Sequence, residues 1–158
     1  MEADSILFDA LRGHEPTLLF GACLEGESLA CATRQFFEAV TKARAQVLDA
    51  FGVEIVAGAD GVSSLDGIIK EMWDTGWSPD RNSLDLFMAD FGVLFAAALL
   101  GIAGAAPVFR SSQVIDHMSV WLPQAGMEVF PIHKVLKCLR HSEGENLGQV
   151  FRSAAGEV

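Results

Sequence analysis

Residues 83–104 read SLDLFMADFGVLFAAALLGIAG, and this apolar stretch decides the fold. Ser83 is a favoured N-cap residue, and Asp85 stands in the first turn, where the helix dipole stabilises a carboxylate. We therefore predict a helix over about 84–104. Apolar side chains lie on nearly every face of it, which is typical of a helix buried in the core. One narrow stripe of small or acidic residues either faces water or admits a neighbouring backbone: Asp90, Ala97, Gly101 and Gly104.

The nineteen residues from Phe91 to Phe109 carry no charge, so the segment has the length of a membrane span. Glycines and alanines lower its hydropathy, however, and Pro107 interrupts it. Arg110 is the only cation close by, whereas membrane spans usually have several Lys and Arg residues at one end. We therefore predict a buried helix that leads into a strand, in a soluble domain that does not bind membranes.

The sequence before this stretch predicts mainly helices. Apolar residues recur at helical spacing over about 29–51, with Ser28 as the cap and Gly52 just past the end. Residues 53–57 have the composition of a short strand. The other elements expected in this half are a short helix at 4–12, a strand or helix at 16–24 and a helix at about 65–74.

The sequence after the stretch predicts strands and then helices. Pro123 to Gly126 has the residue types of a turn between two strands, which indicates a hairpin. Pro131 is at the favoured first position of a helix. The expected elements are strands at 108–110, 114–122 and 127–130, a helix from 131 and a last helix at about 145–154. This order indicates one α+β domain over 1–158, in which an antiparallel sheet of three to four strands packs against the buried central helix, with flanking helices.

Several short motifs of residues 63–152 occur in an order that resembles small bacterial single-domain families of uncharacterised function. They are Ser64-Leu65-Asp66 at a helix start, Asp90-Phe91-Gly92 in an apolar helix, Phe130 to Val135 after a hairpin, and Gly144 to Leu147 before the last helix. These families have no established catalytic residues, so the resemblance assigns no site. It implies a protein of the size and kind of an immunity protein.

The net charge of −10 lies in the first part of the chain, because residues 1–90 hold sixteen acidic and six basic side chains and residues 91–158 hold five of each. A field of this sign repels nucleic acid and anionic membranes and speeds encounter with a basic protein. The alternative is that the charge only maintains solubility. The three cysteines form no CxxC pair, and the acidic N-terminus lacks the features of a secretory signal, so we expect a cytoplasmic protein.

Acidic residues are densest over residues 60–90, where two tryptophans also occur. Trp is enriched at binding hot spots, and carboxylates steer a basic partner. We therefore expect a non-enzymatic interaction module, such as an inhibitor or immunity-type protein that binds a basic partner. The candidate binding residues are Trp73, Asp74, Trp77, Asp80 and Asp85. A homodimer formed through an apolar patch is a further alternative.

A small enzyme or ligand-binding protein is the other hypothesis, and it depends on Asp90. A carboxylate among apolar neighbours has a raised pKa, which suits a general acid or base, and His117 or His133 is its candidate partner. A pocket that holds Asp90 and a histidine would favour this hypothesis, whereas a flat acidic surface would favour the interaction module.

We expect no cofactor and no metal site. Cys138 and His141 share a helix face, as two metal ligands do. His133 is about 140° from Cys138 around the helix axis, so the three side chains cannot converge on one ion. The helix after Pro131 has a basic face, formed by Lys134, Lys137, Arg140 and His141. This face either complements the helix dipole in solvent or binds a phosphate or carboxylate.

Overall fold

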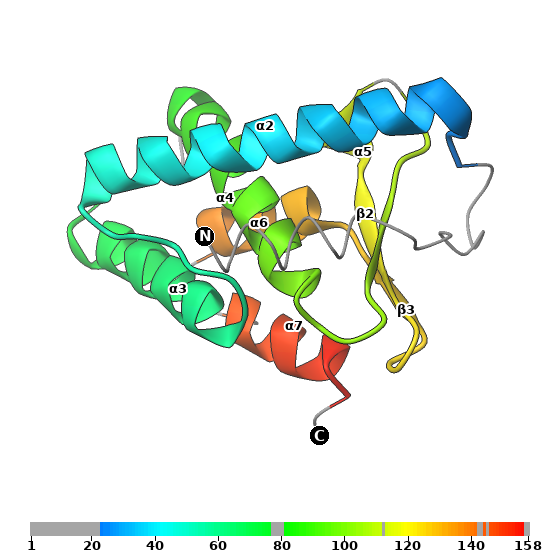
Figure 1. The fold of residues 1–158 in the computed structure, drawn as a ribbon. Helices are drawn as coiled ribbons and strands as arrows, with labels where there is room; N and C mark the ends of the chain where they lie inside the picture. Colours follow the sequence, from blue (N-terminus) through cyan, green and yellow to red (C-terminus); the bar gives the residue numbers. More distant parts are fainter. Residues whose placement is uncertain (1–22, 77–80, 112, 142–143, 145, 157–158) are drawn as a thin grey trace.

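The computed structural model describes residues 23–76, 81–111, 113–141, 144 and 146–156, and for residues 81–86 and 116 it describes the backbone. The predicted α+β class with a small antiparallel sheet is confirmed. Figure 1 shows α4 at the centre of the molecule, the other helices around it and the strands at one side. The elements are α2 (Gly26–Phe51), α3 (Ala59–Asp74), α4 (Arg81–Leu99), β1 (Ala106–Val108), α5 (Val114–His117), β2 (Ser119–Leu122), β3 (Met127–Val129), α6 (Pro131–Arg140) and α7 (Leu147–Ala154).

The central helix α4 is buried, as its all-round apolar sequence predicts. Phe91, Phe95 and Leu99 have no exposed surface, and the helix packs mainly against α6 and α2. It ends at Leu99 rather than near 104. From there the hydrogen bonds shorten to three-residue spacing, as in the bond from the Gly101 N–H to the Ala98 carbonyl, and the chain turns toward β1.

Helices α4 and α6 approach each other closely at Gly92 of α4. A Cβ added there would lie 2.2 Å from Cδ1 of Ile132 on α6, which is far inside van der Waals contact. A larger residue at this position would therefore force the Ile132 side chain to shift. The predicted stripe of small residues does not include this glycine, and Ala97 of that stripe is buried rather than exposed to water.

The sheet has the order β1-β2-β3, with both neighbouring pairs antiparallel. The predicted hairpin is confirmed: Val120 pairs with Val129, and the Gly126 N–H donates to the Pro123 carbonyl across the turn. Val120 and Val129 are almost fully buried in the core. The sheet therefore packs its apolar side against the helices.

Two predicted strand segments are wrong. Residues 53–57 form no strand but link α2 to α3, and the Val56 carbonyl lies so close to Gly61 that a Cβ there would be 1.8 Å from it. The first part of the predicted strand at 114–122 is the short helix α5. One helical turn places Val114 and Met118 on the same side, where both are buried, and this tertiary gain overrides the β-propensity of Val114.

The helix predicted at 4–12 and residues 16–22 of the ambiguous segment lie outside the described residues. In the described part of that segment, the Leu24 N–H donates to the Phe109 carbonyl at 2.7 Å. The helices after the hairpin are as predicted in type. Pro131 begins α6, and α7 begins at Leu147 after an Asn146–Gln149 capping box.

Candidate functional site

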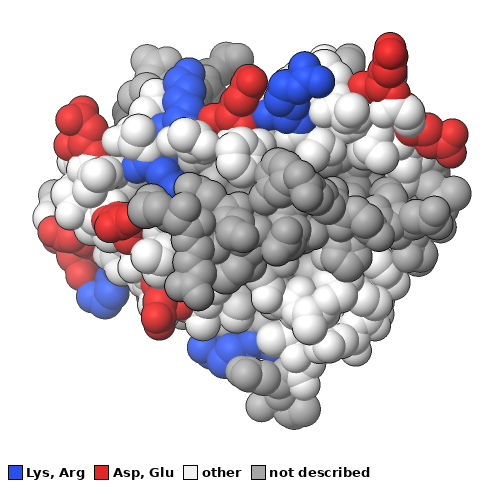
Figure 2. All heavy atoms as spheres, viewed as in Figure 1, with Lys and Arg blue, Asp and Glu red and all other residues white. Residues whose placement is uncertain are grey.

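The surface charges are mixed along α2 and predominantly acidic on α3. Helix α2 has equal numbers of acidic and basic side chains, and Figure 2 shows both signs interspersed across the upper part of the molecule, where α2 runs. Helix α3 has four acidic residues against Lys70 alone: Asp60, Asp66, Glu71 and Asp74. Among the described helices, α3 thus has the largest excess of acidic side chains.

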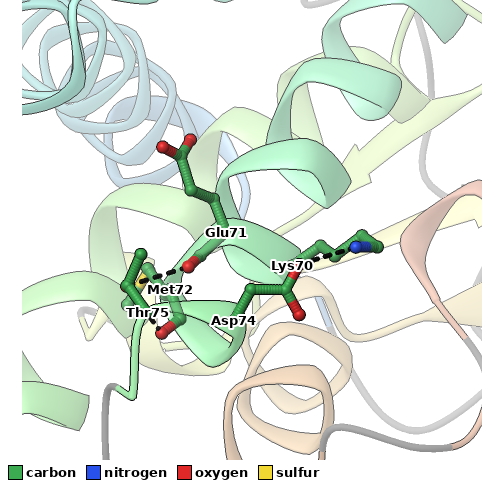
Figure 3. A network of polar contacts seen from close by, with 5 residues as sticks. All are labelled: Lys70, Glu71, Met72, Asp74 and Thr75. Carbon is green, nitrogen blue, oxygen red and sulfur yellow. Dashed lines mark hydrogen bonds and ion pairs between the residues drawn. The ribbon is translucent and has the colours of Figure 1, made fainter.

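The exposed part of α3 includes one of the predicted binding residues, Asp74. Its carboxylate forms an ion pair with Lys70 at 2.6 Å, and both side chains are more than half exposed. Figure 3 shows this pair on one side of the helix and the Glu71 carboxylate pointing away from it. The Thr75 hydroxyl donates to the backbone carbonyls of Glu71 and Met72, which closes the last turn of α3. The Asp74 carboxylate is therefore held in an ion pair within the helix, whereas the nearby Glu71 carboxylate points away from that pair.

Trp73, another predicted binding residue, is half-buried and joins two helices. Its indole N–H donates to the Cys138 carbonyl in the last part of α6, at 3.2 Å. This bond links the side chain to a backbone carbonyl in the last turn of α6. The side chain therefore contributes to the fold, and only part of the ring remains available to a partner.

The surface of α3 borders a cavity of about 400 Å³, which α6 and the region before α7 close on the other side. Trp73 and Asp74 both line it, and so do His141 and Asn146. A volume of this size accommodates a side chain or a small ligand. The structure thus brings two of the predicted binding residues to the wall of one cavity.

Asp66, also on the wall of this cavity, has a structural role. Its carboxylate accepts the backbone N–H of Leu147 at 2.9 Å and that of Gly148 at 2.8 Å, at the start of α7. Burial raises the pKa of the Asp66 carboxyl, and this effect exceeds the lowering by the two N–H donors and by Arg152. From the sequence, Asp66 is recognisable only as part of a helix start, because nothing local indicates its partner more than eighty residues away.

The remaining three predicted binding residues are not described at the level of their side chains. Trp77 and Asp80 lie outside the described residues, and Asp85 is described only as part of the α4 backbone. The prediction that these residues bind a partner therefore stays a prediction.

The second candidate residue, Asp90, lies in a cavity of its own. The space measures about 380 Å³, and its wall includes Gln46, Phe51 and Phe87. The Gln46 amide nitrogen, oriented toward the carboxylate because the amide oxygen would face only acceptors, donates to Oδ1 at 3.0 Å and Oδ2 at 2.7 Å. Burial raises the pKa of Asp90, and the charge of Lys42 opposes this shift.

Neither predicted histidine partner lines the Asp90 cavity. His117 lies beside the Ser111 hydroxyl, with Nδ1 3.1 Å from Oγ, and His133 packs edge-on against the Phe130 ring. The partner of Asp90 is Gln46, which sequence reasoning missed because an amide on α2 has no recognisable spacing relative to α4. Acid–base catalysis by an Asp–His pair therefore lacks support among the described residues.

Cys138 and His141 both line the cavity beside α3. No group of three His, Cys, Asp or Glu side chains within the described ranges is close enough together to hold a metal ion. On α6, Lys137 and Arg140 are exposed and stand in the last turn, where their charge complements the helix dipole.

A buried polar group at the sheet was not predicted from the sequence. The Arg110 guanidinium forms an ion pair with the Glu128 carboxylate at 2.5 Å, and the Ser119 hydroxyl donates to the same carboxylate oxygen. The Glu128 side chain is 1% exposed. The antiparallel pairing of β1 with β2 and of β2 with β3 brings the neighbourhoods of these residues together, and the strand order was not predicted from the sequence.

Among the helices of the described residues, none combines the length and the hydropathy that crossing a membrane requires. Comparison of the chain with protein-family models, with curated proteins and with solved structures finds no match in any of the three. The resemblance to small bacterial families therefore stays a prediction.

Proposed function

We propose that the protein is a non-catalytic interaction module that binds a basic protein partner through the exposed face of α3. The observation that carries this proposal is the position of the cavity of about 400 Å³ that Trp73 lines. This cavity lies beside Asp74 on α3, the most acidic of the described helices. A cavity next to carboxylates suits a long cationic side chain, because its apolar stem is buried while its charge is paired.

Two parts of α3 contribute differently to such binding. Asp60 and Glu71 are exposed and make no ion pair with a described residue, so they supply long-range attraction. Asp74 is already paired with Lys70, and a partner's cation must displace that lysine. Exposed ion pairs contribute only about 0–1 kcal/mol, so this exchange costs little.

The net charge of −10 supports the same function, since it favours encounter with a basic protein over binding to nucleic acid. An inhibitor or immunity-type protein that covers a basic enzyme or toxin is the form of this function that we favour. The proposal makes no use of a histidine or a cofactor.

The test compares charge reversal on α3 with matched reversal on α2. The partner is recovered from the native host with the tagged parent chain, and its binding kinetics are measured over a range of salt concentrations. Reversal of Glu71 and Asp74 to Lys is expected to slow association about tenfold or more at low salt, because steering by charge acts on the association rate.

The matched control is Glu27→Lys with Glu38→Lys, which makes the same change in net charge on exposed positions of α2. This control is expected to slow association much less and to leave dissociation unchanged. Equal effects of the two double variants would show that only net charge matters, and would contradict a binding face on α3.

A further inference from the structure

The cavity at the C-terminal end of α2 holds a carboxylate that makes no ion pair with a described residue. Asp90 is half-buried, and its hydrogen bonds come from the neutral amide of Gln46. The charge of Lys42 lowers the pKa of Asp90, but these two residues form no ion pair with each other. A half-buried carboxylate that lacks a counter-ion favours the arrival of a cation.

The walls of this cavity suit an organic cation better than a metal ion. The Phe51 and Phe87 rings stand at 53° to each other with centroids 5.6 Å apart, and Phe91 packs beneath both of them. Aromatic rings attract cations through their negative faces, and they also bury apolar stems. The described residues provide no third metal ligand here.

The other charged residue of the wall adds to the preference for a cation. Asp49 is exposed at the same cavity, and the described wall includes no Lys, Arg or His. The cavity therefore attracts cations and repels anions. Its volume of about 380 Å³ lies at the small end of the range of ligand pockets.

We propose that this cavity binds the ammonium or guanidinium head of a small organic cation, with the head on the Asp90 carboxylate and the apolar stem against Phe51 and Phe87. The head donates hydrogen bonds to the carboxylate oxygens that Gln46 also contacts. This site is formed by α2 and α4, and it does not depend on the proposed role of α3.

The first test uses n-butylammonium as the probe and n-butanol as its uncharged counterpart, with binding followed by NMR chemical shifts of the full chain. The parent is expected to bind n-butylammonium saturably, and n-butanol much more weakly. Asp90→Asn keeps the shape and one of the two acceptor oxygens for Gln46 but removes the charge. It is expected to weaken binding of the ammonium by about tenfold or more, the range for a lost hydrogen bond to a charged group.

The matched control is Glu27→Gln near the N-terminal end of α2, which removes one carboxylate at an exposed site and is expected to leave the affinity unchanged. A second variant, Gln46→Lys, keeps Asp90 and places an ammonium group beside it from an exposed helix position. This internal cation is expected to compete with the probe and to abolish binding. The variant remains informative if Asp90→Asn does not fold.

Binding of n-butylammonium is also expected to strengthen as the pH rises through the pKa of Asp90, because only the ionised carboxylate attracts the probe. Asp90→Asn is expected to remove this pH dependence. Equal binding by Asp90→Asn and the parent, equal binding of n-butanol, or absence of saturable binding to the parent would each overturn the proposal.

A cationic head occurs on free amines as an ammonium and on the Arg side chain of a partner as a guanidinium, and a second probe distinguishes the two sources. Blocked arginine amide presents a guanidinium with a peptide backbone attached. If it binds at least as tightly as n-butylammonium, the site accepts a protein side chain; if it binds only more weakly, the ligand is a free amine. Both results support the proposed cation site and identify its source.

Discussion

The Asp66 carboxylate in α3 accepts the backbone N–H of Gly148 at 2.8 Å, so a single side chain ties the start of α7 to the middle of α3. Its other oxygen accepts the N–H of Leu147. Helix N-termini leave such N–H groups without intrahelical partners, and here a residue from another helix satisfies two of them. The attachment of α7 therefore depends on a polar contact as well as on its buried apolar side chains.

Asp66→Ala is expected to destabilise the fold by about 1–3 kcal/mol, because it leaves two N–H groups at the start of α7 without their acceptor. Urea denaturation followed by circular dichroism measures this change. The control is Asp74→Ala on the same helix, whose exposed ion pair contributes about 0–1 kcal/mol. If both variants lose the same stability, the contact with α7 is not a significant part of the fold.

Asp90→Asn is expected to change the pH dependence of stability. The folded chain holds the Asp90 proton more tightly than the unfolded chain does, since burial raises its pKa. Stability from this group is therefore lost as the pH rises from the ordinary carboxyl pKa through the raised value. The free energy of unfolding of Asp90→Asn, relative to the parent, should increase between about pH 3 and pH 7. A constant difference over this range would contradict the burial of the charge.

Trp73→Phe tests whether the indole N–H stabilises the joint between α3 and α6. The variant keeps an aromatic ring but removes the donor to the Cys138 carbonyl, so a loss of about 0.5–1.5 kcal/mol is expected. Thermal unfolding followed by near-ultraviolet circular dichroism measures it. An unchanged melting temperature would mean that the hydrogen bond contributes nothing, and that the tryptophan is present for another reason.

The buried ion pair of Arg110 and Glu128 is expected to be sensitive to removal of one partner. Glu128→Leu leaves a guanidinium without its counter-ion in a nearly dry position, which costs about 3–5 kcal/mol. The double variant Arg110→Met with Glu128→Leu is expected to recover much of this loss. Denaturant titration of the single and double variants gives the coupling, and a strictly additive result would contradict a direct interaction.

Local sequence signals predicted the elements whose position depends on few distant contacts. The turn residues Pro123 to Gly126 and the helix-starting Pro131 were enough for the hairpin and for the start of α6. The spacing of apolar residues predicted α2, and Gly52 ends it in the left-handed conformation. Backbone conformation at these positions is set largely by neighbours in the chain.

What could not be predicted depends on residues far apart in sequence. The pairing of Gln46 with Asp90 requires the crossing of α2 and α4, and the contact of Arg110 with Glu128 requires the strand register. Residues 53–57 have β-propensity but no strand beside them to pair with in the described structure. The candidate site was therefore only partly predictable: Trp73, Asp74 and Asp90 were identified, whereas their actual partners were not.

The fit between Gly92 and Ile132 also limits the routes by which this chain can evolve. Enlarging residue 92 first forces a methyl group into Cδ1 of Ile132, and overpacking of this kind costs about 1–3 kcal/mol. Shortening Ile132 to Val first costs about 0.5–1.5 kcal/mol and removes Cδ1, the nearest of the obstructing atoms. Descendants with alanine at 92 are therefore expected to have passed through a smaller residue at 132, so the order of the two changes is constrained as well as their combination.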